Sequence, residues 1–193
     1  MKTYYHFTSN KLRDGRPIPP IGEWLEHEGP VIPCKSGLHA SEHPADALKF
    51  APGCMLHLVE LDGEIIPHGD DKVVASRRRI IATIDATDLL DGYTRWCALR
   101  IIDRWDAPDI VRRFLETGDD TLRSEAIKAA WVATEARTAW VAEARAAWAA
   151  AAKAARTAWV EAETAWTETK TENAERQTQR NHLLQLVNKA FGI

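Results

Sequence analysis

The second half of the sequence has almost none of the residues that interrupt helices. All nine prolines lie at or before Pro108, and no glycine occurs between Gly118 and Gly192. Because proline and glycine favour turns and break helices, we expect strands and loops first and helices afterwards. The sequence therefore predicts an α+β protein: a small mixed α/β domain over residues 1–90, a helical connector over 91–118, and a long Ala/Trp-rich helical arm over 119–193.

Cysteine and long apolar runs are also scarce. The three cysteines are widely spaced and form no Cys-x-x-Cys motif, which gives no support to a zinc site or a disulfide framework and favours reduced thiols. No apolar run approaches the roughly 18 residues of a membrane helix, and the N-terminus lacks the apolar stretch of a signal peptide. We therefore expect a cytoplasmic protein without a membrane partner.

Charge is nearly balanced, with a formal net charge of -3. This balance, without aromatics interleaved among basic residues, gives no support to nucleic-acid binding. The local exception is the run Arg77, Arg78 and Arg79, which begins a predicted strand, so that Arg78 points to one face and its neighbours to the other. Guanidinium groups there could hold phosphate or an acidic partner; the alternative is a charged strand end.

The first half alternates β-prone segments with turn-forming ones. Ser41 is the expected N-cap of a helix that Pro52 and Gly53 end. The expected elements are strands over 2–7, 34–40, 54–61 and 78–84, a helix over 41–50, a helical turn around 23–25 within a long loop, and turns at 62–63 and 68–71.

The arm repeats an Ala-Trp-Val pattern. We expect a helix that starts at Asp106 and ends at Gly118, a second start at 119–121, and a turn near 167–173 that lets 173–191 fold back. As one helix, residues 119–191 would span about 110 Å, which is unusually long for so small a protein and favours the turn. The returning helix, about 30 Å long, cannot cover a partner helix of about 70 Å. We therefore expect a homo-oligomer, as a helical bundle or coiled coil, the alternative being a monomeric bundle with tryptophan in its core. The interface residues would be Trp131, Trp140, Trp148, Trp159 and Trp166.

The common catalytic and metal-binding motifs are absent. There is no HExxH, GxSxG, P-loop or GxGxxG pattern, so metallopeptidase, hydrolase, NTPase and dinucleotide-fold functions have no support, and no metal site is predicted.

Two short segments resemble the first two motifs of the ADP-ribosyltransferase fold. They are Tyr5-His6-Phe7-Thr8-Ser9 and Gly37-Leu38-His39-Ala40-Ser41, the latter followed by a helix with small and aromatic residues. The resemblance implies that His6 contacts the ribose of NAD and that His39 takes the place of the aromatic that stacks on nicotinamide. It also makes Thr8 and Ser41 candidate ligand contacts. Arginine stands where that family has its catalytic glutamate; Glu60 is the nearest alternative carboxylate.

A longer stretch resembles an uncharacterised domain family of bacteriophage and prophage proteins. It runs from Cys34-x-x-Gly37-x-His39 through Asp46-Ala47-Leu48 to 71–76, and the Ala/Trp-rich tail resembles tails on such proteins. This resemblance implies a phage origin and brings no activity with it.

Three functions remain open from the sequence. The first is a phage accessory or anti-defence protein that binds a nucleotide-like ligand or a host defence protein and oligomerises through its arm. Its ligand residues would be His6, Thr8, His39, Ser41 and Arg77–Arg79. The second is a structural or assembly protein that acts through the arm. The third is an ADP-ribosyltransferase that uses NAD, with Glu60 as a non-standard acid; no other cofactor is indicated.

Overall fold

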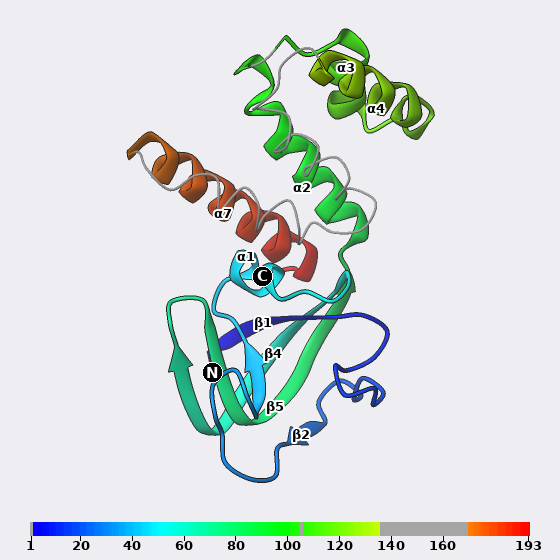
Figure 1. Ribbon diagram of the computed structural model, residues 1–193. Coiled ribbons are helices and arrows are strands. Elements are labelled where there is room, and N and C mark those ends of the chain that lie inside the picture. The colour runs from blue at the N-terminus through cyan, green and yellow to red at the C-terminus, as the bar shows by residue number, and fades with distance from the viewer. Residues whose placement is uncertain (1, 105, 136–169) are drawn as a thin grey trace. The chain divides into compact units, whose positions relative to one another are not determined.

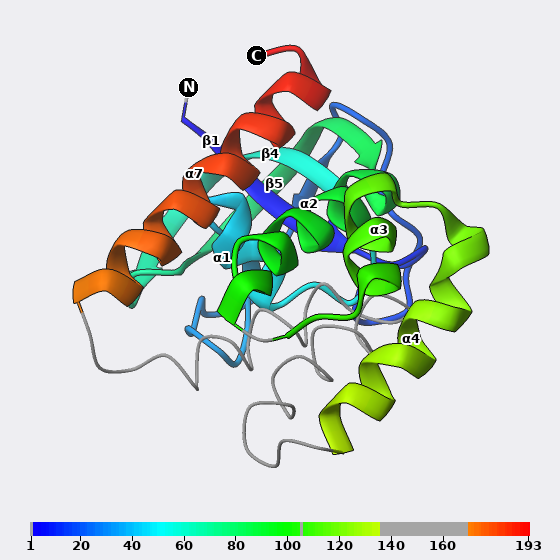
Figure 2. The ribbon, with the colours of Figure 1, turned by 90° about the horizontal axis from the view of Figure 1, so that it is seen from above.

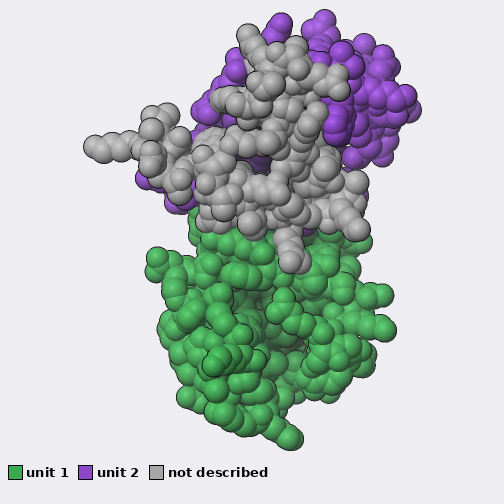
Figure 3. All heavy atoms as spheres, viewed as in Figure 1, with its two compact units in different colours: residues 1–87, 180–193 green, residues 88–179 purple. Residues whose placement is uncertain are grey.

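The computed structural model describes residues 2–104, 106–135 and 170–193. Contacts between residues divide the chain into two compact units (Figure 3): residues 1–87 with 180–193, and residues 88–179. The C-terminal residues therefore fold together with the N-terminal region.

The first unit is built on a five-stranded antiparallel sheet (Figure 1). Its long hairpin consists of β4, Met55–His68, and β5, Lys72–Asp85. Strand β1, Thr3–Thr8, pairs with β4. On the other side of β5 lie two three-residue strands, β2, Trp24–Glu26, and β3, Leu38–Ala40. A single helix, α1, Pro44–Lys49, interrupts the strands.

Cross-strand pairing gives the sheet two different faces. Directly opposed residues of an antiparallel pair share a face. The pairs of Tyr5 with Leu58 and of Phe7 with Leu56 therefore form an apolar face, which is buried. Tyr5 Oη donates a hydrogen bond of 3.0 Å to Asn188 Oδ1 from this face. The C-terminal part of helix α7, Lys170–Phe191, thus lies against β1, beside α1 (Figures 1 and 2).

The opposite face of β1 and β4 is polar near the ends of the strands. His6 pairs with His57, and Tyr4 pairs with Val59. Tyr4 and Val59 belong to an apolar cluster with Ala40, Val73 and Ile80. The apolar cluster thus passes into a group of buried polar residues along the same two strands.

The second unit is helical within its described part. It contains α2, Thr87–Leu99, α3, Asp109–Thr117, α4, Asp120–Glu135, and a short 3₁₀ helix, Ile102–Arg104. Val111, Phe114 and Ala126 lie in its core. As expected, Gly118 ends α3, in the left-handed conformation with φ of 68°. Asp119 accepts a 2.9 Å hydrogen bond from the Thr121 amide at the start of α4.

The expected fold class is wrong: the N-terminal part is mostly antiparallel sheet rather than a small mixed α/β domain. Residues 62–63, expected to form a turn, lie within β4, and the helical turn expected around 23–25 is strand β2, whereas the turn expected at 68–71 does join β4 to β5. Gly63 explains the first error, because it adopts φ of 75° opposite Ser76, whose Oγ accepts a 2.9 Å hydrogen bond from the Glu64 amide. The glycine forms a bulge within the strand instead of a hairpin turn.

Two expected helix caps are also wrong. His43, not Ser41, caps α1, since its Nδ1 accepts a 3.1 Å hydrogen bond from the Ala45 amide. Helix α3 begins at Asp109 after Pro108, without a side-chain cap, so Asp106 does not start it. The expected arm over 119–193 is described only as α4 and α7.

No helix in the described part of the chain is both long and apolar enough to cross a membrane.

Candidate functional site

A buried hydrogen-bonded row crosses the polar face of the sheet. His57, with no exposed surface, places Nε2 2.7 Å from Thr8 Oγ1 and Nδ1 2.8 Å from Thr83 Oγ1. The single hydroxyl proton of Thr8 is donated to the Ser9 carbonyl at 2.9 Å. Thr8 must therefore accept from His57 Nε2–H, which leaves Nδ1 to accept from Thr83. The row fixes one neutral tautomer of His57.

Burial keeps both histidines of this face neutral. Burial, with a further contribution from the Arg78 charge, lowers the pKa of His57 to about 4. The His6 ring stacks near that of His57, with the centroids 6.4 Å apart. Burial and the nearby Arg78 charge hold the pKa of His6 well below its usual value. At neutral pH these rings add no positive charge of their own.

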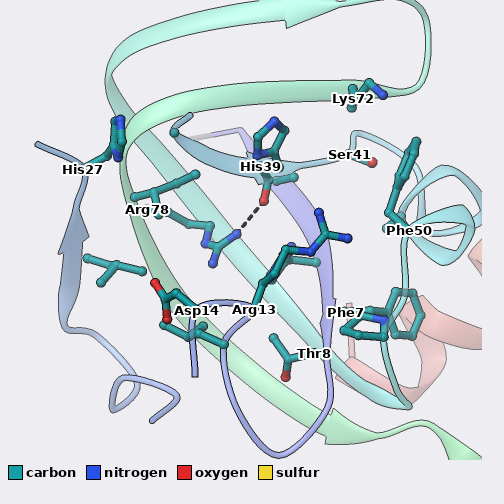
Figure 4. Close-up of a pocket in the computed structure, with 18 of the residues that line it drawn as sticks. Phe7, Thr8, Arg13, Asp14, His27, His39, Ser41, Phe50, Lys72 and Arg78 are labelled. Carbon is teal, nitrogen blue, oxygen red and sulfur yellow. Dashed lines mark hydrogen bonds between the residues drawn. The ribbon is translucent and has the colours of Figure 1, made fainter. Parts of the chain in front are cut away.

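A cavity of about 560 Å³ adjoins this face of the sheet (Figure 4). Its walls come from β1, β3, Arg78 of β5, and α1 with the residues that follow it. Two loops add residues from 11–16 and 34–37, and Leu25, His27 and Lys72 also line the cavity. Gly37 adopts φ of 113° there, and an added Cβ would lie 2.5 Å from Val74 Cγ2, so only glycine fits.

Arg78 is a buried charge that faces the cavity. Arg78 is 6% exposed, and its Nη1 donates a hydrogen bond to the carbonyl oxygen of His39 (Figure 4). Burial lowers the pKa of Arg78 to about 10, so the guanidinium still carries its charge at neutral pH. Among the described residues, no carboxylate pairs with it. Its other N–H groups therefore lack a protein acceptor of opposite charge.

Positive side chains dominate the described lining of the cavity. The sole carboxylate in this lining belongs to Asp14, which pairs with Arg16 at 2.7 Å. The cationic lining residues are Lys11, Arg13, Arg16, Lys35, Lys72 and Arg78. Like charges around one concave site attract an anion and strengthen each hydrogen bond to it. The site can bind and neutralise an anion.

The structure brings five of the seven predicted ligand residues to this cavity. His6, Thr8, His39, Ser41 and Arg78 all contribute to its lining. The imidazole of His39 and its carbonyl oxygen, which binds Arg78, extend to opposite sides of the His39 backbone (Figure 4).

The other two predicted ligand residues, Arg77 and Arg79, are not part of the lining. Arg77 donates to Asp62 at 2.8 Å, and Arg79 donates to Glu60 at 2.7 Å. The guanidinium carbons of both arginines lie over the ring of Trp24, 4.7 and 4.8 Å from its centroid. As strand alternation predicts, Arg78 points to one face and its neighbours to the other.

Glu60, the alternative catalytic acid, likewise does not line the cavity. Its carboxylate is held by Arg79, so the geometry does not place it near a ligand of His6.

Of the five tryptophans expected at an interface, only Trp131 lies within the described residues. It is 50% exposed on α4. Trp140, Trp148, Trp159 and Trp166 lie outside the described residues.

Sequence reasoning missed the cationic loop residues of the cavity. Lys11, Arg13 and Lys35 lie in irregular segments, where no periodicity assigns a direction to a side chain. The concentration of four charged residues within 11–16 is the one sequence signal that points to this wall.

The described residues contain no group of three or more His, Cys, Asp or Glu side chains that could hold a metal ion. A ligand of this cavity would instead be held by Arg78 and Arg13. All residues that line the cavity lie between Tyr5 and Arg78.

Comparison with known proteins finds a family model that matches the part of the chain holding this cavity. No curated protein and no solved structure matches the chain. Residues 2–92 match the model of a domain of unknown function (DUF7666), which spans the whole sheet and every residue of the cavity wall.

Proposed function

We propose that this is a binding protein whose first unit holds a phosphate-bearing, nucleotide-like ligand in the cavity beside Arg78. The observation that carries the proposal is the state of Arg78, a charged side chain that is 6% exposed and has one main-chain acceptor. A buried charge without a counter-ion costs several kcal/mol. A phosphate group supplies both the charge and the acceptor oxygens that Arg78 lacks.

Binding fits the lining better than catalysis does. Its one described carboxylate is paired with Arg16, and its neutral His6 has a pKa well below the range suited to a general base at neutral pH. Because Glu60 is held by Arg79 outside the cavity, ADP-ribosyl transfer is not part of the proposal.

The resemblance to phage and prophage domains supports an accessory or anti-defence setting. In that setting the protein would sequester a nucleotide-like ligand or hold a host defence protein, with the arm bringing copies together. The exposed Trp131 and Val132 near the end of α4, 50% and 72% exposed, support association through the arm and keep an assembly role as a second candidate.

The direct test is isothermal titration of the purified chain with pyrophosphate, ADP, ADP-ribose and NAD at low salt. We expect at least one of them to bind, and Arg78→Met to weaken that binding by roughly 10- to 100-fold, the effect of losing a charged hydrogen bond. Arg79→Met is the matched control, because it removes a neighbouring charge that does not line the cavity. No binding to any of the four, or equal losses in both variants, would contradict the proposal.

A further inference from the structure

Phe50 is a large apolar side chain left partly exposed at the wall of the cavity. It is 41% exposed, although it directly follows the buried helix α1. Its backbone is fixed, since the Phe50 amide donates a 3.1 Å hydrogen bond to the Ala47 carbonyl. The ring is thus presented by a held backbone rather than by a loose loop.

The surroundings of Phe50 combine apolar side chains with one cation. Ala47 and Pro52 line the wall with it. The Nζ of Lys72 lies over the ring, 4.4 Å from its centroid. An aromatic ring with a cation over it suits a flat group that carries hydrogen-bond acceptors.

Phe50 and the buried cation Arg78 lie in separate parts of the lining. In the view of Figure 4, Phe50 and Arg78 stand on opposite sides of the cavity, and the side chain of Arg13 reaches into the space between them. The volume of about 560 Å³ falls within the range of about 300–1,000 Å³ typical of sites for small organic ligands. A bare phosphate ion would leave the aromatic part empty.

Taking the proposed function as given, we infer that the cavity takes a mononucleotide, with its phosphates against Arg78 and Arg13 and its base against Phe50. Phosphate recognition and base stacking then use different residues of one cavity. Stacking on a phenylalanine tolerates every base, since each has a flat π face. The site therefore selects nucleotides as a class over inorganic phosphates and sugar phosphates.

Titration of three probes tests the inference: pyrophosphate, ribose 5-phosphate and ADP, each against wild type, Phe50→Leu and Phe50→Tyr. We expect wild type to bind ADP at least tenfold more tightly than pyrophosphate or ribose 5-phosphate. Phe50→Leu should weaken ADP binding about tenfold, the size of one stacking interaction, and leave pyrophosphate binding within twofold. Phe50→Tyr keeps the ring and should retain wild-type affinity for ADP.

The outcomes separate this inference from the proposed function. If wild type binds pyrophosphate as tightly as ADP, or Phe50→Leu weakens both equally, the base site is wrong and the anion site stands. If wild type binds none of the three, the inference falls, and the proposed function falls with it only when ADP-ribose and NAD also fail to bind. Circular dichroism and thermal unfolding of each variant show whether it is folded before its affinity is compared.

Discussion

Asp46 and Arg180, 134 positions apart in the chain, form a two-pronged ion pair with N–O distances of 2.6 and 2.7 Å. Asp46 lies on α1, next to the wall of the cavity, and Arg180 lies on α7. Burial alone would raise the pKa of Asp46, but the hydrogen bonds and charge of Arg180, with help from Lys49, outweigh it and lower the pKa. The pair fixes the C-terminal helix to the N-terminal sheet unit.

Removing Arg180 should therefore destabilise the fold. Arg180→Met leaves the carboxylate of Asp46, whose side chain is 6% exposed, without its main partner. We expect the free energy of unfolding, measured by urea denaturation, to fall by roughly 3 kcal/mol. Glu42→Gln is the control, because its pair with Lys2 is exposed and should add little stability. Equal midpoints for Arg180→Met and wild type would show that the pair does not anchor the helix.

Mild acid should destabilise the protein through its buried histidines. The folded pKa values of His57 and His43 are about 4, below the usual 6.5, so the unfolded chain binds more protons between these two values. The stability that these neutral histidines contribute is therefore fully present above pH 6.5 and is lost as the pH drops toward 4. For His57 alone the expected loss is roughly 2–3 kcal/mol. The lowered pKa of Asp46 acts only below its usual 3.8 and does not add to this window.

Urea unfolding at several pH values between 7.5 and 4.5 measures this loss. His57→Gln should reduce the pH dependence, and His43→Gln should retain the shares that belong to His57 and to His6, whose pKa is also lowered by burial. If the stability of His57→Gln falls on acidification as steeply as that of wild type, then His57 does not contribute to the loss.

The three cysteines should differ in reactivity. Cys34 and Cys54 are exposed, whereas burial raises the pKa of Cys97 to about 12. Because the thiolate is the reacting form, a thiol reagent at pH 7.5 should modify the first two quickly and Cys97 only on unfolding. Mass spectrometry of peptides after timed alkylation gives the three rates. Fast modification of Cys97 in the folded protein would show that α2 does not bury it.

The local elements of the sheet could be predicted from the sequence because period-two alternation is a local signal. The strands expected over 2–7, 54–61 and 78–84 correspond to β1 and to parts of β4 and β5. The extent of the hairpin could not be predicted, because Gly63 favours a turn and a bulge equally well, and only the partner residue Ser76 decides between them. The ion pair between Arg180 and Asp46 is a long-range contact that no local sequence pattern predicts.

The candidate site was predicted in part for a similar reason. His6, Thr8, His39 and Ser41 lie on or beside strands, where alternation assigns each side chain a face. Arg77 and Arg79 were grouped with Arg78 by charge alone, although alternation already separates them. The sequence places Phe50 at the end of a helix, as the aromatic residue that follows the second motif, but its exposure depends on what the tertiary fold leaves uncovered.

Thermal and chemical unfolding of Arg78→Met, with and without ADP, tests most directly the claim that Arg78 is a buried charge retained for an anionic ligand. Methionine keeps much of the side-chain volume and removes the charge, so the ligand-free variant should be more stable than wild type by about 1–2 kcal/mol. At the same concentration, ADP should raise the midpoint of wild type more than that of the variant, whose affinity is weaker. A variant that is less stable than wild type without ligand, or that ADP stabilises as much as wild type, would contradict the account.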